Sequence, residues 1–275
     1  MNSLRFTKES MTTTRRSFAA MSLGSVIIAT TARAAEPASP LRTYARMRGA
    51  AKDGGLALWW YTGNVWGKPP DDIARLLFRV EGLTFQRMTF MAEGGLEQRM
   101  TGRGWYADAA TGQPLETWTN PFTSEVLTAP HIRSLTRQAI SPQGVMALED
   151  PSRVDKFEGT IGGHAENGDT VWMTENFMAK TKPDAATGAV GTTSSLSTFT
   201  AKRADVDNAG ADFVPCYLNY QSLGAWPGWL KMGGNAGTLS WQTYGRKVRG
   251  PGEGPAALRA WIEKRYPGFL KEPGI

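Results

Sequence analysis

About ten short apolar segments, separated by turn signals, constrain this fold more than any other feature of the sequence. Many are rich in aromatic or β-branched residues, and several alternate apolar and polar positions with a period of two, which is typical of strands. Residues 110–113 and 166–169 carry turn chemistry suited to hairpins. The expected strands are Leu56–Tyr61, Leu77–Phe90, Leu96–Tyr106, Pro114–Trp118, Glu125–His131, Lys156–Ile161, Thr170–Ala179, Leu196–Ala201, Phe213–Gln221 and Thr238–Tyr244.

Helix signals are scarce. Residues 70–77 begin like a helix, with a proline followed by two aspartates near the positive end of the helix dipole. Residues 255–266 are the stronger case, because Leu258, Trp261 and Ile262 form an apolar stripe at helical spacing before a Pro-Gly stop.

The pattern predicts an all-β protein. We expect an antiparallel β-barrel of about ten strands, lipocalin-like in general shape, with a C-terminal helix. A β-sandwich remains the alternative, because periodicity alone does not separate the two. The barrel is favoured because both faces of several strands carry large or mixed polar and aromatic residues, as a lined cavity requires.

The first 34 residues resemble a twin-arginine signal peptide. Arg15 and Arg16 precede Phe18 and an apolar run over residues 19–31, and small residues then mark a cleavage site after position 34 or 35. The alternatives are an ordinary secretory signal or an uncleaved anchor. The apolar run is short for a spanning helix, so we expect no stable membrane span after cleavage. The sequence therefore predicts one domain over residues 35–275, with 35–43 a flexible lead-in, exported by the twin-arginine machinery and periplasmic or secreted.

The basic charge of the chain belongs mainly to this leader. The whole chain has a net charge of +6 and a pI near 9.5. Removing residues 1–34 takes away five basic residues and one acidic residue, which leaves a net charge of +2. We therefore expect no nucleic-acid partner. The lone cysteine, Cys216, excludes an intrachain disulfide and a cysteine-built metal site.

Several segments carry a family resemblance. They are residues 58–63, 77–82, 105–108, 111–112, 115–123, 226–233, 237–239 and 245–247. The Trp-x-Asn-Pro sequence at 118–121 and the Trp-x-x-Trp-x-x-Met-Gly sequence at 226–233 are the most specific. Together they resemble a bacterial and fungal family classed as domain of unknown function 1838. The chain departs from the family pattern at Ser124, where a second glycine is expected, and over residues 133–139. The resemblance implies a single β-rich domain and adds no reaction.

All ten tryptophans lie after residue 34. Each offers a flat apolar face with one N–H donor, so we expect some to line a ligand pocket, although core packing is the commoner role for any single tryptophan. The segment from Trp226 to Trp229 reads as a ligand-facing loop, because a Pro-Gly turn separates its two indoles. Trp118, Asn120 and Arg87 complete the predicted substrate-binding set.

His131 and Glu175 are the candidate catalytic residues. His131 follows the Trp-x-Asn-Pro segment, and a histidine can move protons near neutral pH. Glu175 shares a strand face with Val171 and Met173, and apolar surroundings would raise its pKa. The structural alternative for Glu175, which we favour slightly, is an ion pair with an arginine. Its expected partners are Arg87, Arg99, Arg103 and Arg133.

No motif for a cofactor or a metal site is present in the sequence. The leading hypothesis is an exported barrel that binds a small hydrophobic or aromatic molecule in a tryptophan-lined cavity. Cofactor-free acid–base catalysis there, as an isomerase, lyase or hydrolase, is left open. The rival hypothesis is a non-catalytic envelope or carbohydrate-binding protein that presents an exposed row of indoles.

Overall fold

The computed structural model describes residues 39–152, 154–183 and 190–275. The described residues all lie within Pro37–Ile275, the second of the two units into which the chain divides. The predicted signal peptide over residues 1–34 lies outside the described residues.

The second unit consists mainly of antiparallel strands. Its strands are β1 (Leu56–Lys68), β2 (Arg75–Phe90), β3 (Leu96–Asp108), β4 (Thr117–Thr119), β5 (Val126–Thr128), β6 (Ile132–Ile140), β7 (Val145–Leu148), β8 (Val154–Asn167), β9 (Thr170–Thr181), β10 (Thr192–Lys202), β11 (Tyr217–Gly224) and β12 (Thr238–Val248). Its helices are α1 (Pro40–Arg48), α2 (Arg203–Asp207) and α3 (Ala256–Arg265), with 3₁₀ turns η1 (Gly228–Leu230) and η2 (Pro251–Glu253).

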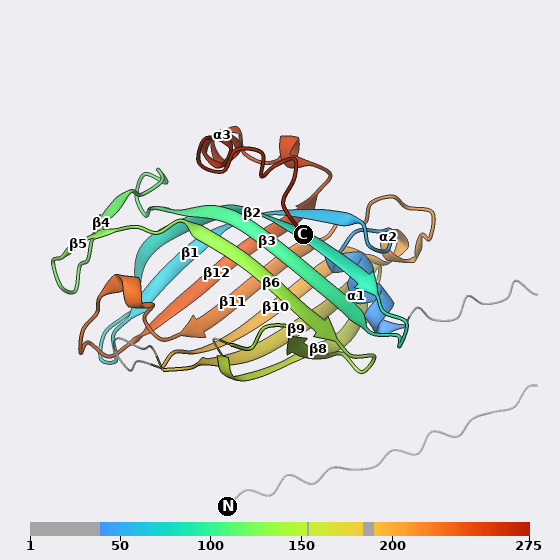
Figure 1. Ribbon diagram of the computed structural model, residues 1–275, viewed down its shortest axis with the longest axis horizontal. Coiled ribbons are helices and arrows are strands. Elements are labelled where there is room, and N and C mark those ends of the chain that lie inside the picture. Colours follow the sequence, from blue (N-terminus) through green and yellow to red (C-terminus); the bar gives the residue numbers. More distant parts are fainter. Residues whose placement is uncertain (1–38, 153, 184–189) are drawn as a thin grey trace, which may run out of the picture. The chain divides into compact units, whose positions relative to one another are not determined.

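Ten of the strands form a closed barrel, in the order β1-β12-β11-β10-β9-β8-β7-β6-β3-β2, and β1 pairs with β2 to complete the circle (Figure 1). The remaining two, β4 and β5, form a separate small sheet. The predicted antiparallel barrel with a C-terminal helix is therefore confirmed, and the sandwich alternative is not what this chain forms.

Two local expectations were wrong. Residues 70–74 form a turn rather than a helix, because the Asp72 carboxylate accepts hydrogen bonds from the Ile73 amide at 2.7 Å and from Arg75 at 2.5 Å, and β2 begins at Arg75. The N-terminal lead-in contains a helix, α1, which begins at Pro40. Ser39 caps it by accepting a hydrogen bond from the Arg42 amide, and a proline suits its first turn.

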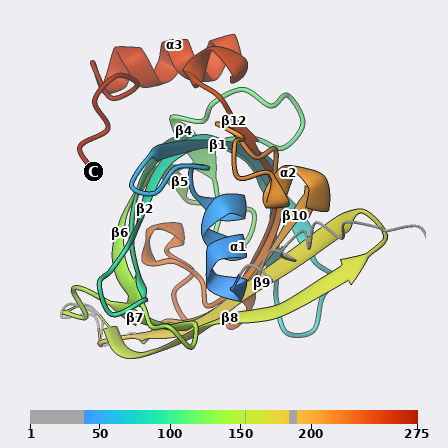
Figure 2. The ribbon, with the colours of Figure 1, turned by 90° about the vertical axis from the view of Figure 1, so that its right-hand side faces the viewer.

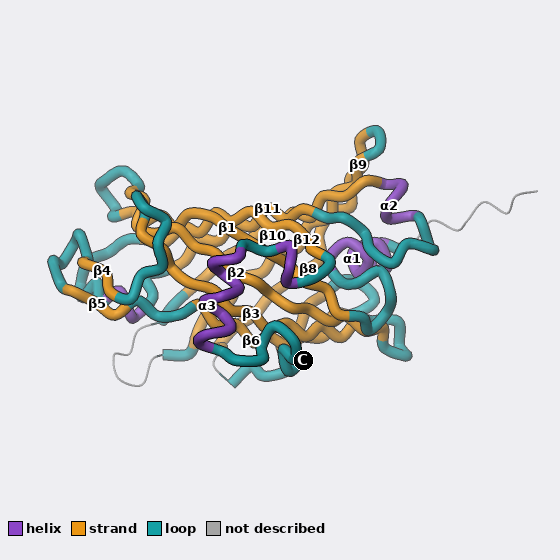
Figure 3. The backbone as a smooth tube through the Cα atoms, turned by 90° about the horizontal axis from the view of Figure 1, so that it is seen from above, coloured by secondary structure: helices purple, strands orange, loops and turns teal. Residues whose placement is uncertain are grey.

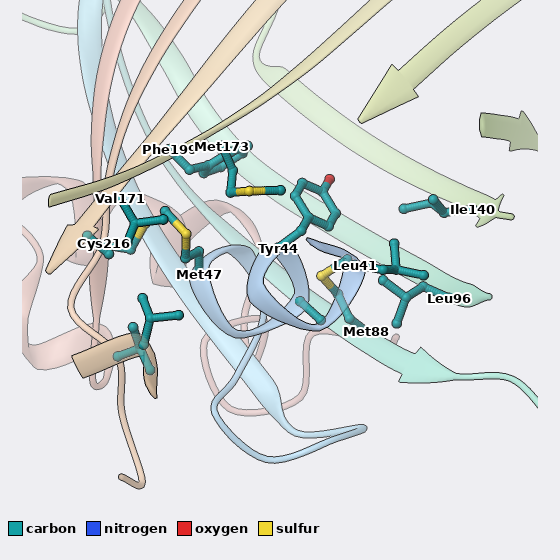
Figure 4. Close-up of a cluster of buried hydrophobic side chains, with 14 of the residues drawn as sticks. Leu41, Tyr44, Met47, Met88, Leu96, Ile140, Val171, Met173, Phe199 and Cys216 are labelled. Atoms are coloured by element: carbon teal, nitrogen blue, oxygen red, sulfur yellow. The ribbon is translucent and has the colours of Figure 1, made fainter. Parts of the chain in front are cut away.

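Helix α1 lies inside one end of the barrel (Figure 2). Leu41, Tyr44 and Met47 follow one another at a spacing of three and are all buried. They pack with inward-facing residues of the surrounding strands, including Met173 and Phe199 (Figure 4). The helix therefore closes this end as a plug.

The C-terminal end of α1 is tied to the barrel wall by polar contacts. The Lys247 ammonium of β12 donates to the carbonyl oxygens of Arg46 and Gly49, both at 2.8 Å. The Trp59 indole of β1 donates to the Arg48 carbonyl at 2.8 Å. These bonds satisfy carbonyl groups that a helix end leaves without internal partners.

Helix α3 packs against the outer surface of the barrel (Figure 3). Leu258 and Ile262 are fully buried there in a cluster with Leu83 and Trp105. The Trp261 ring meets the Trp105 ring edge-on at 5.2 Å. None of the helices in the described ranges is long and apolar enough to cross a membrane.

Candidate functional site

A cavity of about 290 Å³ lies in the barrel interior, beyond the inner surface of α1. Its lining mixes aromatic, aliphatic and polar side chains: Arg48, Trp59, Tyr61, Thr84, Gln86, Met100, Ile132, Ser134, Glu175, Phe177, Ser197, Phe199, Leu218, Tyr220, Trp241 and Thr243. Small-molecule sites commonly combine an apolar wall with a few polar groups in this way.

Strand alternation explains which residues reach the cavity. On β1 and β2 the lining residues occupy alternate positions, and Trp59 on β1 lies directly opposite Thr84 on β2. Gly82 on β2 leaves room for the Tyr61 side chain, because a Cβ at this position would lie 2.3 Å from the Tyr61 hydroxyl. The tyrosine ring therefore lies over the backbone of β2, where only glycine permits such a close approach.

The most polar part of the cavity is a buried network centred on Glu175. One carboxylate oxygen, Oε1, accepts hydrogen bonds from Arg48 Nη1 at 2.6 Å and from Ser197 Oγ at 3.0 Å. The other, Oε2, accepts from the Tyr44 hydroxyl at 2.5 Å. Three donors therefore satisfy both oxygens of this buried carboxylate.

The Arg48 guanidinium is equally well bound. With its amide oxygen turned toward Arg48, Gln98 accepts from Nε at 2.9 Å and from Nη2 at 3.0 Å. Burial lowers the pKa of Arg48, but Glu175 and Tyr44 together raise it, and the resulting pKa lies above the ordinary value for arginine. For the Tyr44 phenol burial acts in the opposite direction and raises the pKa, and the neighbouring Glu175 carboxylate raises it as well. The network is thus a neutralised ion pair with a protonated tyrosine.

Gln86 is the exception among the buried polar groups of the lining. The side chain is only 2% exposed, and Nε2 has no hydrogen-bond partner among the described residues. A buried donor without an acceptor costs about 1–3 kcal/mol, so an acceptor that reached Nε2 would stabilise this site.

Two tyrosines add hydroxyl groups to the cavity wall. Burial raises the pKa of Tyr61 and of Tyr220 above the ordinary value for a phenol. Both hydroxyls therefore stay protonated at neutral pH and are available as donors.

A second cluster closes the end of the barrel opposite α1; we call it the aromatic cap. Its buried members are Val65, Leu77, Phe78, Val80, Tyr106, Leu230, Met232 and Leu239, with Trp118, Phe122, Trp226, Trp229 and Trp241 among the half-buried residues around them. Asn120 holds the cap together, because its Nδ2 donates to the Leu230 carbonyl at 2.8 Å. The Trp118 and Trp229 rings lie 6.2 Å apart.

The structure thus brings together four of the predicted binding residues, but in the cap. Trp118, Asn120, Trp226 and Trp229 do not line the cavity, where the indoles are those of Trp59 and Trp241. Asn120 is fully buried, and its Oδ1 also accepts from the Phe122 amide at 2.8 Å. The two most specific segments of the family resemblance, residues 118–121 and 226–233, therefore meet in the aromatic cap.

The other three predicted residues, Glu175, Arg87 and His131, lie in different parts of the barrel. Glu175 lines the cavity, and it forms the ion pair that the sequence offered as its alternative role, with Arg48 in place of the four expected partners. Arg87 is exposed, on the opposite face of β2 from Gln86.

His131 lies under α3, outside the cavity lining. Its Nδ1 is 2.8 Å from the Tyr266 hydroxyl, and its ring centroid is 4.8 Å from that of Trp261. Burial and the Arg265 guanidinium lower its pKa.

Sequence reasoning missed Tyr44, Arg48 and Gln86. A signal for the first two was present, since Ser39 and Pro40 form a helix start and the buried residues recur at helical spacing. Gln86 carries no such signal, because a glutamine inside an apolar strand reads the same whether it is paired or not.

No group of three or more histidine, cysteine, aspartate or glutamate side chains that could hold a metal ion occurs within the described ranges.

No curated protein matches the chain. Among solved structures, Ail, the attachment invasion locus protein of Yersinia pestis, matches 71% of this chain and 99% of its own at 8% identity. Its TM-score of 0.21 is too low to support an inference. The profile of the family described as "Protein of unknown function (DUF1838)" matches residues 55–274. The chain belongs to this family.

Proposed function

We propose that this protein binds a small aromatic or apolar molecule in the barrel cavity, and that the ligand carries a hydrogen-bond acceptor that meets Gln86. The observation that carries the proposal is the unpaired Nε2 of Gln86 within a lining that is otherwise largely aromatic and aliphatic. Ligand pockets run from about 300 to 1,000 Å³, so a cavity near the lower limit suits a ligand of one or two rings.

The chemistry of Glu175 supports binding more than proton transfer. A general acid or base must release and regain a proton near neutral pH. Both oxygens of Glu175 already accept hydrogen bonds from Arg48, Tyr44 and Ser197, so the carboxylate is engaged within the protein. In the proposed function Glu175 positions α1 and gives the cavity one polar end.

The rival carbohydrate-binding function has less support. Stacking on sugars would need a flat row of exposed indoles. Each of the ten tryptophans is buried or half-buried, and the exposed large apolar side chains are of other types.

Intrinsic tryptophan fluorescence tests the proposal, because Trp59 and Trp241 line the cavity. Titration with 2-acetylnaphthalene, an acceptor without donors, should quench the emission of the protein. Thr84→Phe should abolish the quenching by filling the cavity, whereas Thr62→Phe, at an exposed position on β1, should leave it unchanged. Equal quenching in the wild type and in both variants would place the probe elsewhere and contradict the proposal.

The acceptor requirement has its own test. Gln86→Leu removes the unpaired donor at similar size, so it should weaken binding of 2-acetylnaphthalene about fivefold to tenfold, as the loss of one hydrogen bond does. Binding of naphthalene, which has no acceptor, should be unchanged. A variant that binds both probes as the wild type does would show that Gln86 does not select the ligand.

We also propose export of this chain by the twin-arginine route, on the sequence of residues 12–34 alone. Replacing Arg15 and Arg16 by lysine should retain the protein in the cytoplasm, as measured by cell fractionation. A Lys8→Arg variant is the matched control outside the arginine pair.

A further inference from the structure

The strand pairing of the closed barrel is incomplete along β6. Strand β6 pairs with β3 along its whole length, from Ile132 opposite Gly104 to Ile140 opposite Leu96. On its other side it pairs with β7 only at residues 138–140. Within the described part of the chain, residues 132–136 have no strand partner on that side.

The unpaired edge of β6 borders both the cavity and the outside. Ile132 and Ser134 line the cavity, and Arg133 between them is exposed on the outer surface. An outer groove of about 1210 Å³ runs along this edge, and Ser134 lines the groove as well as the cavity. Ser134 is therefore the point at which the groove and the cavity meet.

Two arginines face each other beside this edge. The β3–β6 register places Arg103 directly opposite Arg133, and both line the groove. Like charges directly opposite each other on neighbouring strands destabilise a sheet. Burial lowers the pKa of Arg103, and the facing Arg133 guanidinium lowers it further.

The neighbouring arginine pair shows how the sheet normally relieves this repulsion. Arg99 and Arg137 are also directly opposite each other. Arg99 forms an ion pair with Glu97 at 2.7 Å, and Arg137 approaches Glu149 at 3.9 Å. Each member of this second pair thus has a carboxylate of its own.

Arg103 and Arg133 have no such carboxylate within 4.0 Å among the described residues. Arg103 Nη1 donates to the Gly102 carbonyl at 2.8 Å, while its Nε is buried without a partner. The Arg103 guanidinium lies 5.0 Å from the ring centroid of Tyr266 and 4.4 Å from that of Phe269. Glu272 lines a smaller groove next to Arg103 without forming an ion pair with it. The aromatic rings hold the guanidinium in place and leave its charge uncompensated.

We propose that the unpaired edge of β6 is the entrance to the cavity, and that Arg103 and Arg133 bind an anionic group of the ligand there. This inference rests on the proposed function and adds the ligand's class, an amphiphilic anion. Its apolar part passes Ile132 and Ser134 into the cavity, and its carboxylate, sulfate or phosphate stays at the two arginines. Such an anion supplies the charge that the Arg99–Arg137 pair receives from Glu97 and Glu149.

The affinity test uses acids in which one to five methylene groups join a naphthalene ring to a carboxylate. The Kd of each acid is compared with that of its methyl ester by tryptophan fluorescence. At least one acid should bind at least tenfold more tightly than its ester, and salt should reduce the difference. The double variant Arg103→Gln/Arg133→Gln should abolish this preference and leave ester binding unchanged. Arg99→Gln, in the compensated pair, is the matched control and should keep the preference.

The outcomes separate the two proposals. If acids and esters bind equally, or if the preference survives in the double variant, the arginine site is wrong while cavity binding stands. If neither acid nor ester binds, and 2-acetylnaphthalene also fails to quench the protein, the proposed function itself falls.

The entrance is tested by rates. Thr136 lines the groove but not the cavity, so Thr136→Trp should narrow the opening and slow association and dissociation together, with the Kd little changed. Ala139→Trp, where β6 is paired on both sides, should leave both rates unchanged. Unchanged rates in Thr136→Trp would show that the ligand enters elsewhere.

Discussion

Arg48 and Glu175 form a buried ion pair with a separation of 2.6 Å, and through it α1 is joined to β9. Their side chains are 9% and 5% exposed, respectively. A buried charge is costly unless it is paired and hydrogen-bonded, so the pair requires the helix to sit at one depth and one rotation in the barrel. The position of the plug, and with it one wall of the cavity, is therefore set by polar contacts as well as by packing.

Arg48→Met should lower the free energy of unfolding by about 3–5 kcal/mol, because it leaves the Glu175 carboxylate buried without its counter-ion. Urea denaturation followed by circular dichroism measures this change. Arg249→Met, which breaks the exposed pair with Asp212, is the matched control and should cost at most about 1 kcal/mol.

Combining Arg48→Met with Glu175→Leu should recover most of the lost stability, because replacing both partners of a buried pair by apolar groups is often neutral. The same denaturation experiment applies. A double variant as unstable as Arg48→Met alone would contradict this. It would show that losing the hydrogen bonds from Tyr44 and Ser197 to the Glu175 carboxylate costs as much as leaving that carboxylate without Arg48.

Asn120→Ala should lower the free energy of unfolding by about 1–3 kcal/mol, because the Leu230 carbonyl and the Phe122 amide both lose their buried partner. Thermal denaturation measures the loss, and a shift in tryptophan emission should report loosening around Trp229. Asn235→Ala is the control, since this exposed asparagine bonds a carbonyl of the same loop. Equal losses in the two variants would argue against a special role for Asn120.

Acid should weaken the docking of α3 through His131. Burial and Arg265 lower the folded-state pKa of His131 below its ordinary 6.5. The unfolded chain therefore takes up this proton first, so the stability contributed by neutral His131 is present above pH 6.5 and is lost as the pH falls below it. His131→Phe should flatten the stability profile between pH 6.5 and 5 in denaturation curves. An unchanged slope would assign the acid sensitivity to other groups.

The Cys216 thiol should react slowly in the native protein. Burial raises its pKa to about 12, so almost none is thiolate at pH 8, the reactive form. Reaction with 5,5′-dithiobis(2-nitrobenzoate) should be slow in buffer and fast in urea. Because the thiol has a higher pKa in the folded chain than the 9.0 of the unfolded chain, its neutral form stabilises the fold at pH values below 9.0. This contribution is lost as the pH rises from 9.0 toward 12. Cys216→Ala should remove that alkaline loss.

The sequence predicts best the strands that bury most of their residues. β2, β3 and β12 follow the expected ranges closely because most of their residues are buried or half-buried, and aromatic and other large apolar side chains recur along each of them. β6 was missed because its less exposed residues include the polar Ser134 and Thr136, which line the cavity or the groove, and its outward residues include Arg133 and Arg137. A strand between a cavity and solvent buries little, so its sequence carries a weak periodic signal.

The candidate site was less predictable than the fold for a related reason. Glu175 could be identified as a carboxylate on an apolar strand face, but its partner Arg48 lies on a helix 127 residues earlier. Only the closed barrel brings these positions together. Trp118 and Trp229 were predicted to bind a ligand, but the same indole can line a pocket or fill a core, and here both pack in the aromatic cap.

The pairing of β1 with β12 makes this barrel dependent on its own last strand. Leu58 is opposite Val248, and Lys247 next to it bonds the carbonyls at the end of α1. Contacts between such distant positions form late, because loop-closure entropy must be paid before they stabilise the chain. A nascent chain would keep the edge of β1 unpaired until Val248 leaves the ribosome, so folding of the domain is expected to follow synthesis rather than accompany it.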